Sequence, residues 1–181
     1  MKSKLIACTV AAGLAVSLAA PAHANGLFRE LRVGVLAHDV PDLWSGFRVE
    51  DAPVAFNFEA VLTPSLPFLG GAIRPAIGAS VTSGDSTSSA YLDARWEFET
   101  SAGIFFGLGL GVVVHNGQED LKDLALKALG STVLFHIPFE VGLRLDAHNS
   151  LSVYFEHMSN GEFANFNEGL DRLGVRYGYR F

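Results

Sequence analysis

Cysteine is nearly absent from this chain, whose 181 residues contain a single one, Cys8. It lies within the first 24 residues, a segment with the layout of a secretory signal peptide. The expected mature domain, residues 25–181, therefore has no cysteine. That absence excludes disulfides, thiol chemistry and cysteine–zinc sites from the mature protein.

Residues 1–24 show the three parts of a signal peptide. Lys2 and Lys4 form a positive start, an Ala- and Leu-rich stretch follows, and small residues precede the expected cleavage after Ala24. The apolar stretch is too short and too rich in alanine to favour a membrane-spanning helix. A lipoprotein processing site at Cys8 is disfavoured because almost no apolar segment precedes it. We therefore expect export and cleavage.

Long apolar runs and basic clusters are also missing. Mean hydropathy is high, at +0.28, yet no mature segment offers the roughly 18 consecutive apolar residues of a membrane helix. Acidic residues outnumber basic ones by 19 to 13, and losing Lys2 and Lys4 with the leader moves the formal net charge from -6 to -8. An acidic chain without a basic patch is a poor candidate for nucleic-acid binding.

What the sequence does contain is alternation of apolar and polar residues at period two. In residues 173–181 the odd positions are Leu, Val, Tyr, Tyr and Phe, while the even positions are glycine and arginine. A strand places these two sets on opposite faces. The same alternation recurs upstream and predicts eight strands. Their expected ranges are 29–38, 53–63, 71–82, 87–98, 102–115, 131–146, 148–160 and 168–181.

The composition of the polar face decides between a soluble β-sandwich and a membrane barrel. That face mixes glycine with charges of both signs, and the apolar face is continuous and rich in phenylalanine. Glycine relieves crowding inside a narrow closed barrel but suits a solvated face poorly. We therefore predict an all-β fold, an eight-stranded antiparallel transmembrane β-barrel of the outer membrane. The expected lumen charges are Glu30, Glu59, Asp93, Glu97, Glu140 and Glu156 with Arg32, Arg74, Arg95, Arg144, Arg176 and Arg180.

The links between strands agree with this topology. If both ends of the mature domain lie in the periplasm, the long links 39–52 and 116–130 lie outside the cell, and the links at 100–101 and 147–149 are short periplasmic turns. Helical spacing of apolar residues from Leu121 to Ala128 predicts a short helix in the second long link. The terminal aromatic residue resembles the C-terminal insertion signal of outer-membrane barrels.

Two polar residues end the apolar row of the seventh predicted strand. Parity from Leu151 and Val153 places His157 and Ser159 on the outward face, where polar groups are costly near the bilayer centre. Position alone favours a location at the membrane interface. Their spacing also allows a base–nucleophile pair. Residues two apart on one face of a strand lie about 6.6 Å apart at Cα, so the imidazole can reach the hydroxyl. Asp171, outward on the next strand, supplies an acid to orient the imidazole.

The stretch from His157 to Gly161, followed by Asn167-Glu168-Gly169-Leu170-Asp171, resembles the C-terminal signature of the PagL-type lipid A 3-O-deacylases. The motif match covers residues 157–181. The resemblance implies an outer-membrane barrel with a serine–histidine–acid triad on its lipid-exposed surface, with Ser159 as nucleophile and His157 as base. The acid of the family is usually glutamate, and Asp171 stands at its position.

Three further site residues follow from the resemblance or from their position. Glu168 is the alternative acid, although a regular strand turns it inward. Asn160 matches a residue implied in the oxyanion hole, and Gly161 adds a candidate backbone N–H; Asn-Gly is also a strong turn dipeptide. The remaining histidines are expected to be structural or interfacial, His136 in the lumen and His38, His115 and His148 near strand ends.

The resemblance implies an esterase that removes the 3-O-linked acyl chain of lipid A. The substrate is lipid A or lipopolysaccharide, the site is membrane-embedded, and no metal or cofactor is implied. The location is the outer membrane of a Gram-negative bacterium. The alternative is a non-catalytic barrel with a structural or adhesion role; a channel is disfavoured because side chains fill an eight-stranded lumen. Acyl-chain preference and the choice between monomer and homodimer stay open.

Overall fold

The structure, a computed structural model, describes residues 26–46, 50–52 and 54–181. The predicted signal segment, residues 1–24, lies outside these described residues. Within the described part of the chain, every regular element is a strand. The strands are β1 (Phe28–Ala37), β2 (Val54–Leu62), β3 (Leu66–Phe68), β4 (Gly71–Thr82), β5 (Ser89–Glu99), β6 (Ile104–His115), β7 (Val133–Arg144), β8 (Asn149–Ser159) and β9 (Leu170–Arg180).

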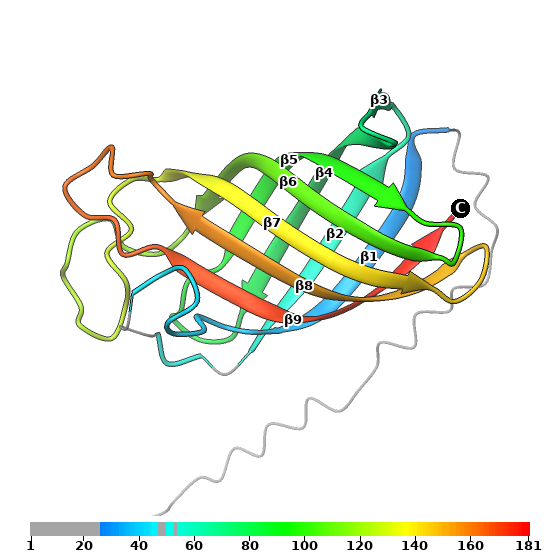
Figure 1. The fold of residues 1–181 in the computed structure, drawn as a ribbon. Coiled ribbons are helices and arrows are strands. Elements are labelled where there is room, and N and C mark those ends of the chain that lie inside the picture. Colours follow the sequence, from blue (N-terminus) through cyan, green and yellow to red (C-terminus); the bar gives the residue numbers. More distant parts are fainter. Residues whose placement is uncertain (1–25, 47–49, 53) are drawn as a thin grey trace, which may run out of the picture.

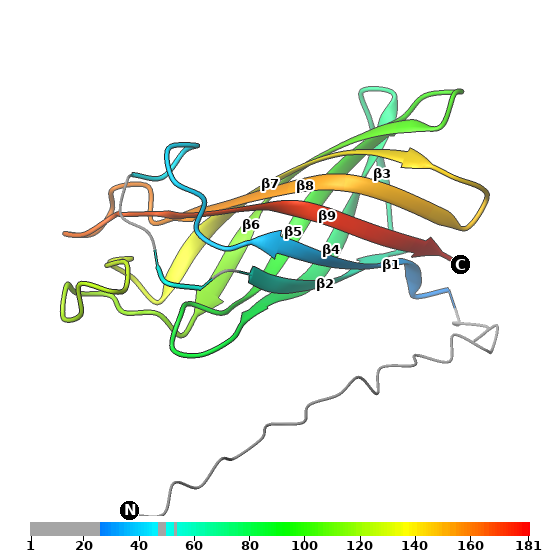
Figure 2. The ribbon, with the colours of Figure 1, turned by 90° about the horizontal axis from the view of Figure 1, so that it is seen from below.

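Eight of these strands close into an antiparallel barrel (Figure 1). From β4 to β9 each strand pairs with the next, β9 pairs with β1, β1 pairs with β2, and the pairing of β2 with β4 completes the ring. Seen from below, β2, β1 and β9 lie side by side (Figure 2). Closure leaves no barrel strand with an unpaired edge, which a bilayer requires. The predicted eight-stranded barrel is confirmed.

The barrel strands begin and end within two residues of their predicted bounds. The exception is β3, which was not predicted. It folds back on β4 through a tight turn in which Leu69 and Gly70 have φ values of 44° and 75°. A three-residue strand that contains Pro67 is too short to show the alternation by which the other strands were found.

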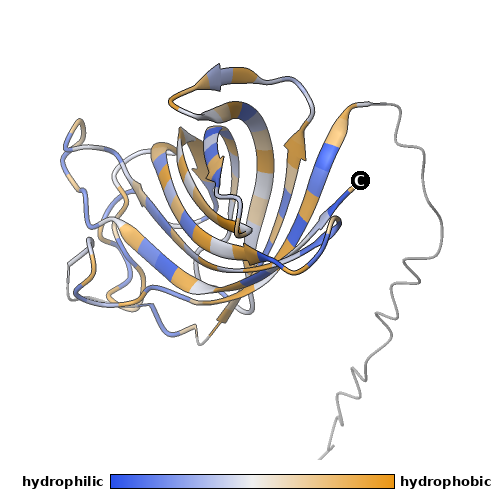
Figure 3. Cartoon of the chain, turned by 45° about the vertical axis from the view of Figure 1, so that its right-hand side comes forward, coloured by the Kyte–Doolittle hydropathy of each residue, from blue (hydrophilic) through white to orange (hydrophobic). Residues whose placement is uncertain are grey.

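The two faces of the wall differ as the alternation predicts. Bands of hydrophilic and hydrophobic residues alternate along the strands (Figure 3). The outward positions are apolar and exposed, with Val33, Phe58 and Val153 each about half accessible. The inward positions are buried and carry the charged and polar residues and glycines, together with an apolar cluster that includes Val113, Leu134 and Met158. This arrangement is the one that suits a barrel with lipid outside and a polar interior.

Paired charges fill the lumen. Oε2 of Glu140 accepts hydrogen bonds from Arg32 (2.6 Å), Arg95 (2.9 Å) and Arg176 (2.5 Å). The guanidinium carbon of Arg176 also lies 3.6 Å from the ring centroid of Tyr154. All five side chains are buried. Because an isolated buried charge is strongly destabilising, the balance of acids and arginines seen in the sequence is what allows this interior.

Glycine makes room for these side chains. A Cβ on Gly111 would lie 2.1 Å from Oδ1 of Asp93, and one on Gly109 would lie 2.6 Å from Cγ of Pro138. Both glycines are on the inward parity of β6. The alternate glycines of this strand therefore accommodate the crowded lumen, as the sequence predicts.

The predicted short helix in the link 116–130 is wrong. The described residues there form turns and bends. The side chain of Gln118 replaces the helical bonds: its Nε2 donates to the carbonyls of Asp123 and Leu126, and its Oε1 accepts from the N–H groups of Lys122 and Asp123. Such local side-chain bonds compete with helix formation. No helix among the described residues has the length and apolar character needed to cross a membrane.

The two ends of the barrel carry different links. The described residues of three links (38–46 with 50–52, 116–132 and 160–169) lie at one end (Figure 1), which we call the long-loop end. The links 100–103 and 145–148, the start of β1 and the C-terminus lie at the other end (Figure 1). The polar residues that end β8 and begin β9 belong to the long-loop end, and the candidate site is built there.

Candidate active site

His157 and Ser159 lie in the last three residues of β8, and Asp171 is the second residue of β9. His157 shares the outward parity of the exposed Leu151 and Val153. The register of the sheet places His157 directly opposite Asp171. Antiparallel pairing therefore brings three residues of nucleophile, base and acid type together on the outer surface near the long-loop end.

Hydrogen bonds connect the three side chains. Nδ1 of His157 lies 2.7 Å from Oδ1 of Asp171, and Nε2 of His157 lies 2.8 Å from Oγ of Ser159. When the Nδ1–H donates to the carboxylate, Nε2 is left to accept the serine proton. The arrangement has the geometry that nucleophilic acyl chemistry requires.

The outward face of the imidazole is covered by residues that the sequence did not identify. The main-chain N–H groups of Trp44 and Ser45 donate to Oδ2 of Asp171 at 2.7 Å and 2.6 Å. The indole of Trp44 stacks on the ring of His157, with centroids 4.4 Å apart and an interplanar angle of 9°. His157 is consequently only 4 % exposed, so it lies beneath a loop where an open lipid contact had been expected.

Glu50 belongs to the same link between β1 and β2 as Trp44 and Ser45, and it forms hydrogen bonds with the links after β4 and β6. Its carboxylate accepts hydrogen bonds from Nε2 of His38 (3.0 Å) and from the N–H groups of Thr87 (2.7 Å) and Lys127 (3.1 Å). Burial alone would raise the pKa of Glu50, but these bonds outweigh it and hold the pKa at about 2. His38, predicted to lie near a strand end, directly follows β1; its ring is buried there and accepts a bond from Arg172.

Asn160, predicted to help form an oxyanion hole, has its side-chain amide committed to loop packing. Nδ2 donates to the carbonyl oxygens of Leu129 (2.9 Å) and Phe166 (2.5 Å), which occupies both of its hydrogens. In this arrangement the Asn160 side chain fastens two loops together, and its bonds give no support to an oxyanion role.

The two acid candidates are separated in the structure. Oε2 of Glu168 accepts the N–H of Ala128 in the neighbouring long link. Asp171 is the acid at hydrogen-bond distance from His157. A regular strand would turn an even-numbered residue inward, but Glu168 precedes β9 and lies in the link before it.

A cavity of about 490 Å³ opens around the serine. It is bounded by β7, β8, the Trp44–Gly46 segment and the link between β8 and β9. Within it, Oδ1 of Asn167 accepts the N–H of Asn160 at 3.0 Å, and among the described residues nothing engages the amide nitrogen of Asn167. The lining residues are Trp44, Ser45, Gly46, Phe135, Ile137, His157, Ser159, Gly161, Glu162, Asn167, Glu168 and Gly169.

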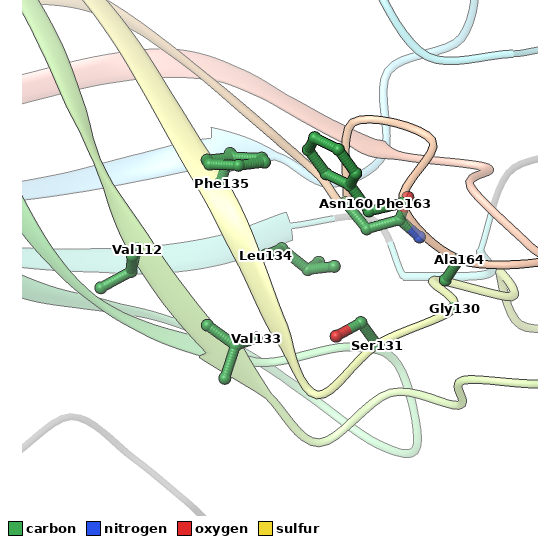
Figure 4. Close-up of a pocket in the computed structure, with 9 residues that line it drawn as sticks. All are labelled: Val112, Gly130, Ser131, Val133, Leu134, Phe135, Asn160, Phe163 and Ala164. Carbon is green, nitrogen blue, oxygen red and sulfur yellow. The ribbon is translucent and has the colours of Figure 1, made fainter.

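A second, more apolar pocket of about 280 Å³ shares Phe135 with the first. Figure 4 shows the residues that line this second pocket. Val133, Phe135 and Phe163 line it together with Val112 of β6. Phe135 belongs to both pockets and lies opposite Ser159 in the pairing of β7 with β8. An apolar chain attached at the serine therefore has an adjacent apolar space on the outer face of the barrel.

The lumen holds a second histidine with acidic neighbours. Nδ1 of His136 lies 2.8 Å from Oδ1 of Asp93, and Nε2 lies 3.2 Å from Oε2 of Glu156. The ring stacks on Tyr91 with centroids 4.3 Å apart. Among the described residues, both ring nitrogens have carboxylate partners and no hydroxyl group is bonded to the ring. In the described part of the chain, no set of three or more His, Cys, Asp or Glu residues is arranged to hold a metal ion.

Comparisons with known proteins agree with this picture. The family Lipid A 3-O-deacylase (PagL) matches residues 42–180. The crystal structure of the outer membrane enzyme PagL superposes with a TM-score of 0.60 and 18 % identity, covering 84 % of this chain and 99 % of that one. Neisserial surface protein A superposes with a TM-score of 0.51 and 11 % identity, covering 85 % of this chain and 97 % of that one. No curated protein sequence matches the chain.

The two structural likenesses, at such low identity, establish the barrel fold. The family match covers the strands from β2 to β9 and includes the Trp44–Ser45 segment. The chain therefore belongs to the lipid A 3-O-deacylase family, hydrolases built on eight-stranded β-barrels of the Gram-negative outer membrane.

Proposed function

We propose that this chain is a serine esterase that removes the 3-O-linked acyl chain of lipid A in the outer leaflet. Ser159 is the nucleophile, His157 the general base and Asp171 the acid that orients His157. The observation that carries the proposal is the relay of two hydrogen bonds, Asp171 Oδ1 to His157 Nδ1 and His157 Nε2 to Ser159 Oγ.

The reaction proceeds in two halves. Nε2 of His157 takes the proton of Ser159 as Oγ attacks the ester carbonyl carbon, and the tetrahedral intermediate expels the sugar 3-oxygen, which receives that proton from His157. Water then attacks the acyl-serine ester with His157 again as base. The products are a free fatty acid and lipid A with a 3-hydroxyl group, and Ser159 is regenerated.

The position of the site suits this substrate. Ser159 follows the exposed apolar residues of β8 at the long-loop end, the level at which sugars of outer-leaflet lipid A meet their acyl chains. The pocket beside Phe135 and Phe163 is lined mainly by apolar side chains and is large enough to hold part of an acyl chain (Figure 4). Burial of an apolar chain contributes about 0.8 kcal/mol per methylene.

Two groups in the cavity are suited to stabilise the oxyanion. Gly161, with φ of 65°, lines the cavity next to Ser159 and contributes a backbone N–H. The amide nitrogen of Asn167 belongs to a residue of the same lining and donates to no acceptor among the described residues. We assign the oxyanion role to these two groups, because the Asn160 amide is already bonded to carbonyls. Such donors act on charge that develops only during the reaction.

The direct test is the mass of lipid A from a Gram-negative host that lacks its own 3-O-deacylase. Expression of the chain is expected to lower the mass by one 3-O-linked acyl chain, and Ser159→Ala is expected to abolish the change. Ser150→Ala is the matched control, since it removes a buried hydroxyl of the same strand that points into the lumen. Unchanged lipid A with correctly inserted wild type would contradict the proposal and favour a structural barrel.

Export is proposed to remove residues 1–24. The mature outer-membrane protein is then expected to begin at Asn25, which N-terminal sequencing or intact mass of the purified protein measures. A mature protein that retains Lys2 and Lys4 would contradict this assignment.

A further inference from the structure

The segment Trp44–Ser45 makes three contacts with the site that the mechanism above does not use. Two are main-chain hydrogen bonds to Oδ2 of Asp171, and the third is the stack of the indole on the imidazole of His157. The segment comes from the link between β1 and β2, whereas its partners lie on β8 and β9. Groups far apart in sequence therefore meet at the site.

The contacts leave the acid little freedom. Oδ1 of Asp171 faces His157, and Oδ2 faces two N–H donors at 2.7 Å and 2.6 Å. Hydrogen bonds to an ionised carboxylate are about twice as strong as neutral ones. Rotation of the carboxylate would break either the bond to the histidine or both bonds to the loop. The main chain of the loop thus fixes the oxygen that orients the base.

The indole restricts the base in a different direction. It lies nearly parallel to the imidazole, at 9° and 4.4 Å, and a tilt of the imidazole would meet it. Gly169 also approaches the ring closely: a Cβ added there would lie 3.0 Å from Oγ of Ser45 and 3.2 Å from Cε1 of His157. The loop, the ring and the start of β9 are therefore packed closely together.

We propose that Trp44 and Ser45 are positioning residues for deacylation, so that the site is complete only when this loop is docked on β8 and β9. The inference rests on the proposed function of Ser159, His157 and Asp171. Trp44 and Ser45 act through the other residues: the N–H groups hold the carboxylate, and the indole holds the plane of the imidazole.

Trp44 could instead act only as an anchor of the barrel at the membrane interface, and the two roles predict different results. The side chain is 53 % exposed, and tryptophan at a membrane interface anchors barrels in the headgroup region. An anchor would affect insertion or binding of a lipid substrate. It would not change the reactivity of Ser159 toward a small soluble reagent. Rates of serine labelling therefore distinguish an anchor from a positioning residue.

The experiment measures two rates on purified, folded protein in detergent: labelling of Ser159 by a small fluorophosphonate, and deacylation of purified lipid A. Trp44→Leu is expected to lower both the labelling rate and kcat by about tenfold to a hundredfold, with KM nearly unchanged, because small displacements of a base are costly. Trp44→Phe keeps a stacked ring and is expected to stay within about threefold of wild type.

The main-chain donors are tested at Ser45. Ser45→Pro removes the N–H that donates to Asp171 and is expected to lower both rates by about tenfold or more, whereas Ser45→Ala keeps that N–H and is expected to lose much less. Trp96→Leu is the matched control for loss of a tryptophan, since Trp96 bonds to the carbonyl of Phe68 at the other end of the barrel. Heat-modifiable migration on gels reports the folded fraction of each variant.

The outcomes separate the two proposals. If Ser159→Ala is neither labelled nor active while Trp44→Leu and Ser45→Pro keep wild-type rates, the positioning role is wrong and the esterase stands. A rise in KM alone for Trp44→Leu, with unchanged labelling, also overturns it in favour of an anchor. Deacylation that survives in Ser159→Ala would overturn the proposed function itself.

Discussion

Two histidines of this barrel have nearly the same surroundings on opposite faces of the wall. Nδ1 of His157 lies 2.7 Å from an aspartate oxygen on the outer surface, and Nδ1 of His136 lies 2.8 Å from one in the lumen. Each ring stacks on an aromatic side chain, with centroids 4.4 Å apart in one case and 4.3 Å in the other. Both side chains are buried. The shared unit alone therefore does not mark an active site.

The difference lies at Nε2. His157 meets the hydroxyl of Ser159, whereas His136 meets the carboxylate of Glu156. Two carboxylate neighbours require both ring nitrogens of His136 to donate, which makes it an imidazolium with no basic nitrogen. A single carboxylate leaves Nε2 of His157 able to accept a proton. The outer histidine also adjoins a cavity, so its hydroxyl partner has room for a substrate.

Replacing each histidine with glutamine is expected to give the largest contrast. His157→Gln removes the base and should lower kcat for lipid A by about 10⁴-fold or more, with little effect on unfolding. His136→Gln removes a charge from a buried network and should lower the free energy of unfolding by roughly 3–5 kcal/mol, leaving the activity of folded protein near wild type. Deacylation kinetics and urea unfolding of the two purified variants measure this.

The comparison fails if the two variants behave alike. Loss of kcat in folded His136→Gln would mean that the lumen network takes part in the reaction. Wild-type kcat in His157→Gln would remove the base from the proposed mechanism. Glutamine is used in both because it keeps polarity and approximate length without a titratable ring.

Changing the acid of the outer group is expected to have the next largest effect. In Asp171→Asn, the amide oxygen can accept the loop N–H groups only if its NH₂ group faces Nδ1 of His157, which forces the proton onto Nε2. The base is then in the wrong tautomer, and kcat should fall by about 10²- to 10⁴-fold. In Asp171→Glu the carboxylate remains but is displaced by one methylene, and a smaller loss, of about tenfold to a hundredfold, is expected.

These two variants test whether both oxygens of Asp171 matter. If Asp171→Glu were as active as wild type, the fixed position of Oδ2 against the loop would be unimportant. If Asp171→Asn kept its activity, Glu168 or another acid would have to orient His157. Deacylation kinetics with folded protein, checked by gel mobility, decide between these outcomes.

The sequence predicts the barrel well because a membrane wall imposes a strict rule on each residue. Outward positions must be apolar and inward ones must pair their charges, so period-two alternation determines both the strands and their faces. The same rule placed His157 and Asp171 on one face of neighbouring strands. Register then made them opposite each other, which parity alone does not specify.

The rest of the site lies in links, where no such rule holds. The bonds from Trp44 and Ser45 to Asp171 use main-chain N–H groups, which every residue except proline possesses. Nothing in the side chains of the link 39–52 indicates which N–H groups will be used. The helix expected near Leu121 failed for a related reason, since the Gln118 amide takes over the backbone groups that a helix would pair.

The smallest expected effect concerns the link between β1 and β2, which packs on His157 and has no counterpart at His136. The pKa of Glu50, about 2 against an ordinary 4.5, is lowered by its bonds in the folded state. Ionised Glu50 therefore stabilises the docked loop fully above about pH 4.5, and that contribution is lost as pH falls through about 2.

Pepsin, which is active in this range, is expected to cut near Leu43 and Trp44 at pH 2 but not at pH 4.5, while the barrel strands stay intact. Glu50→Gln should be cut at both pH values. Equal cleavage of wild type at both would show that Glu50 does not hold the loop, and the dependence of His157 on a docked loop would then need another cause.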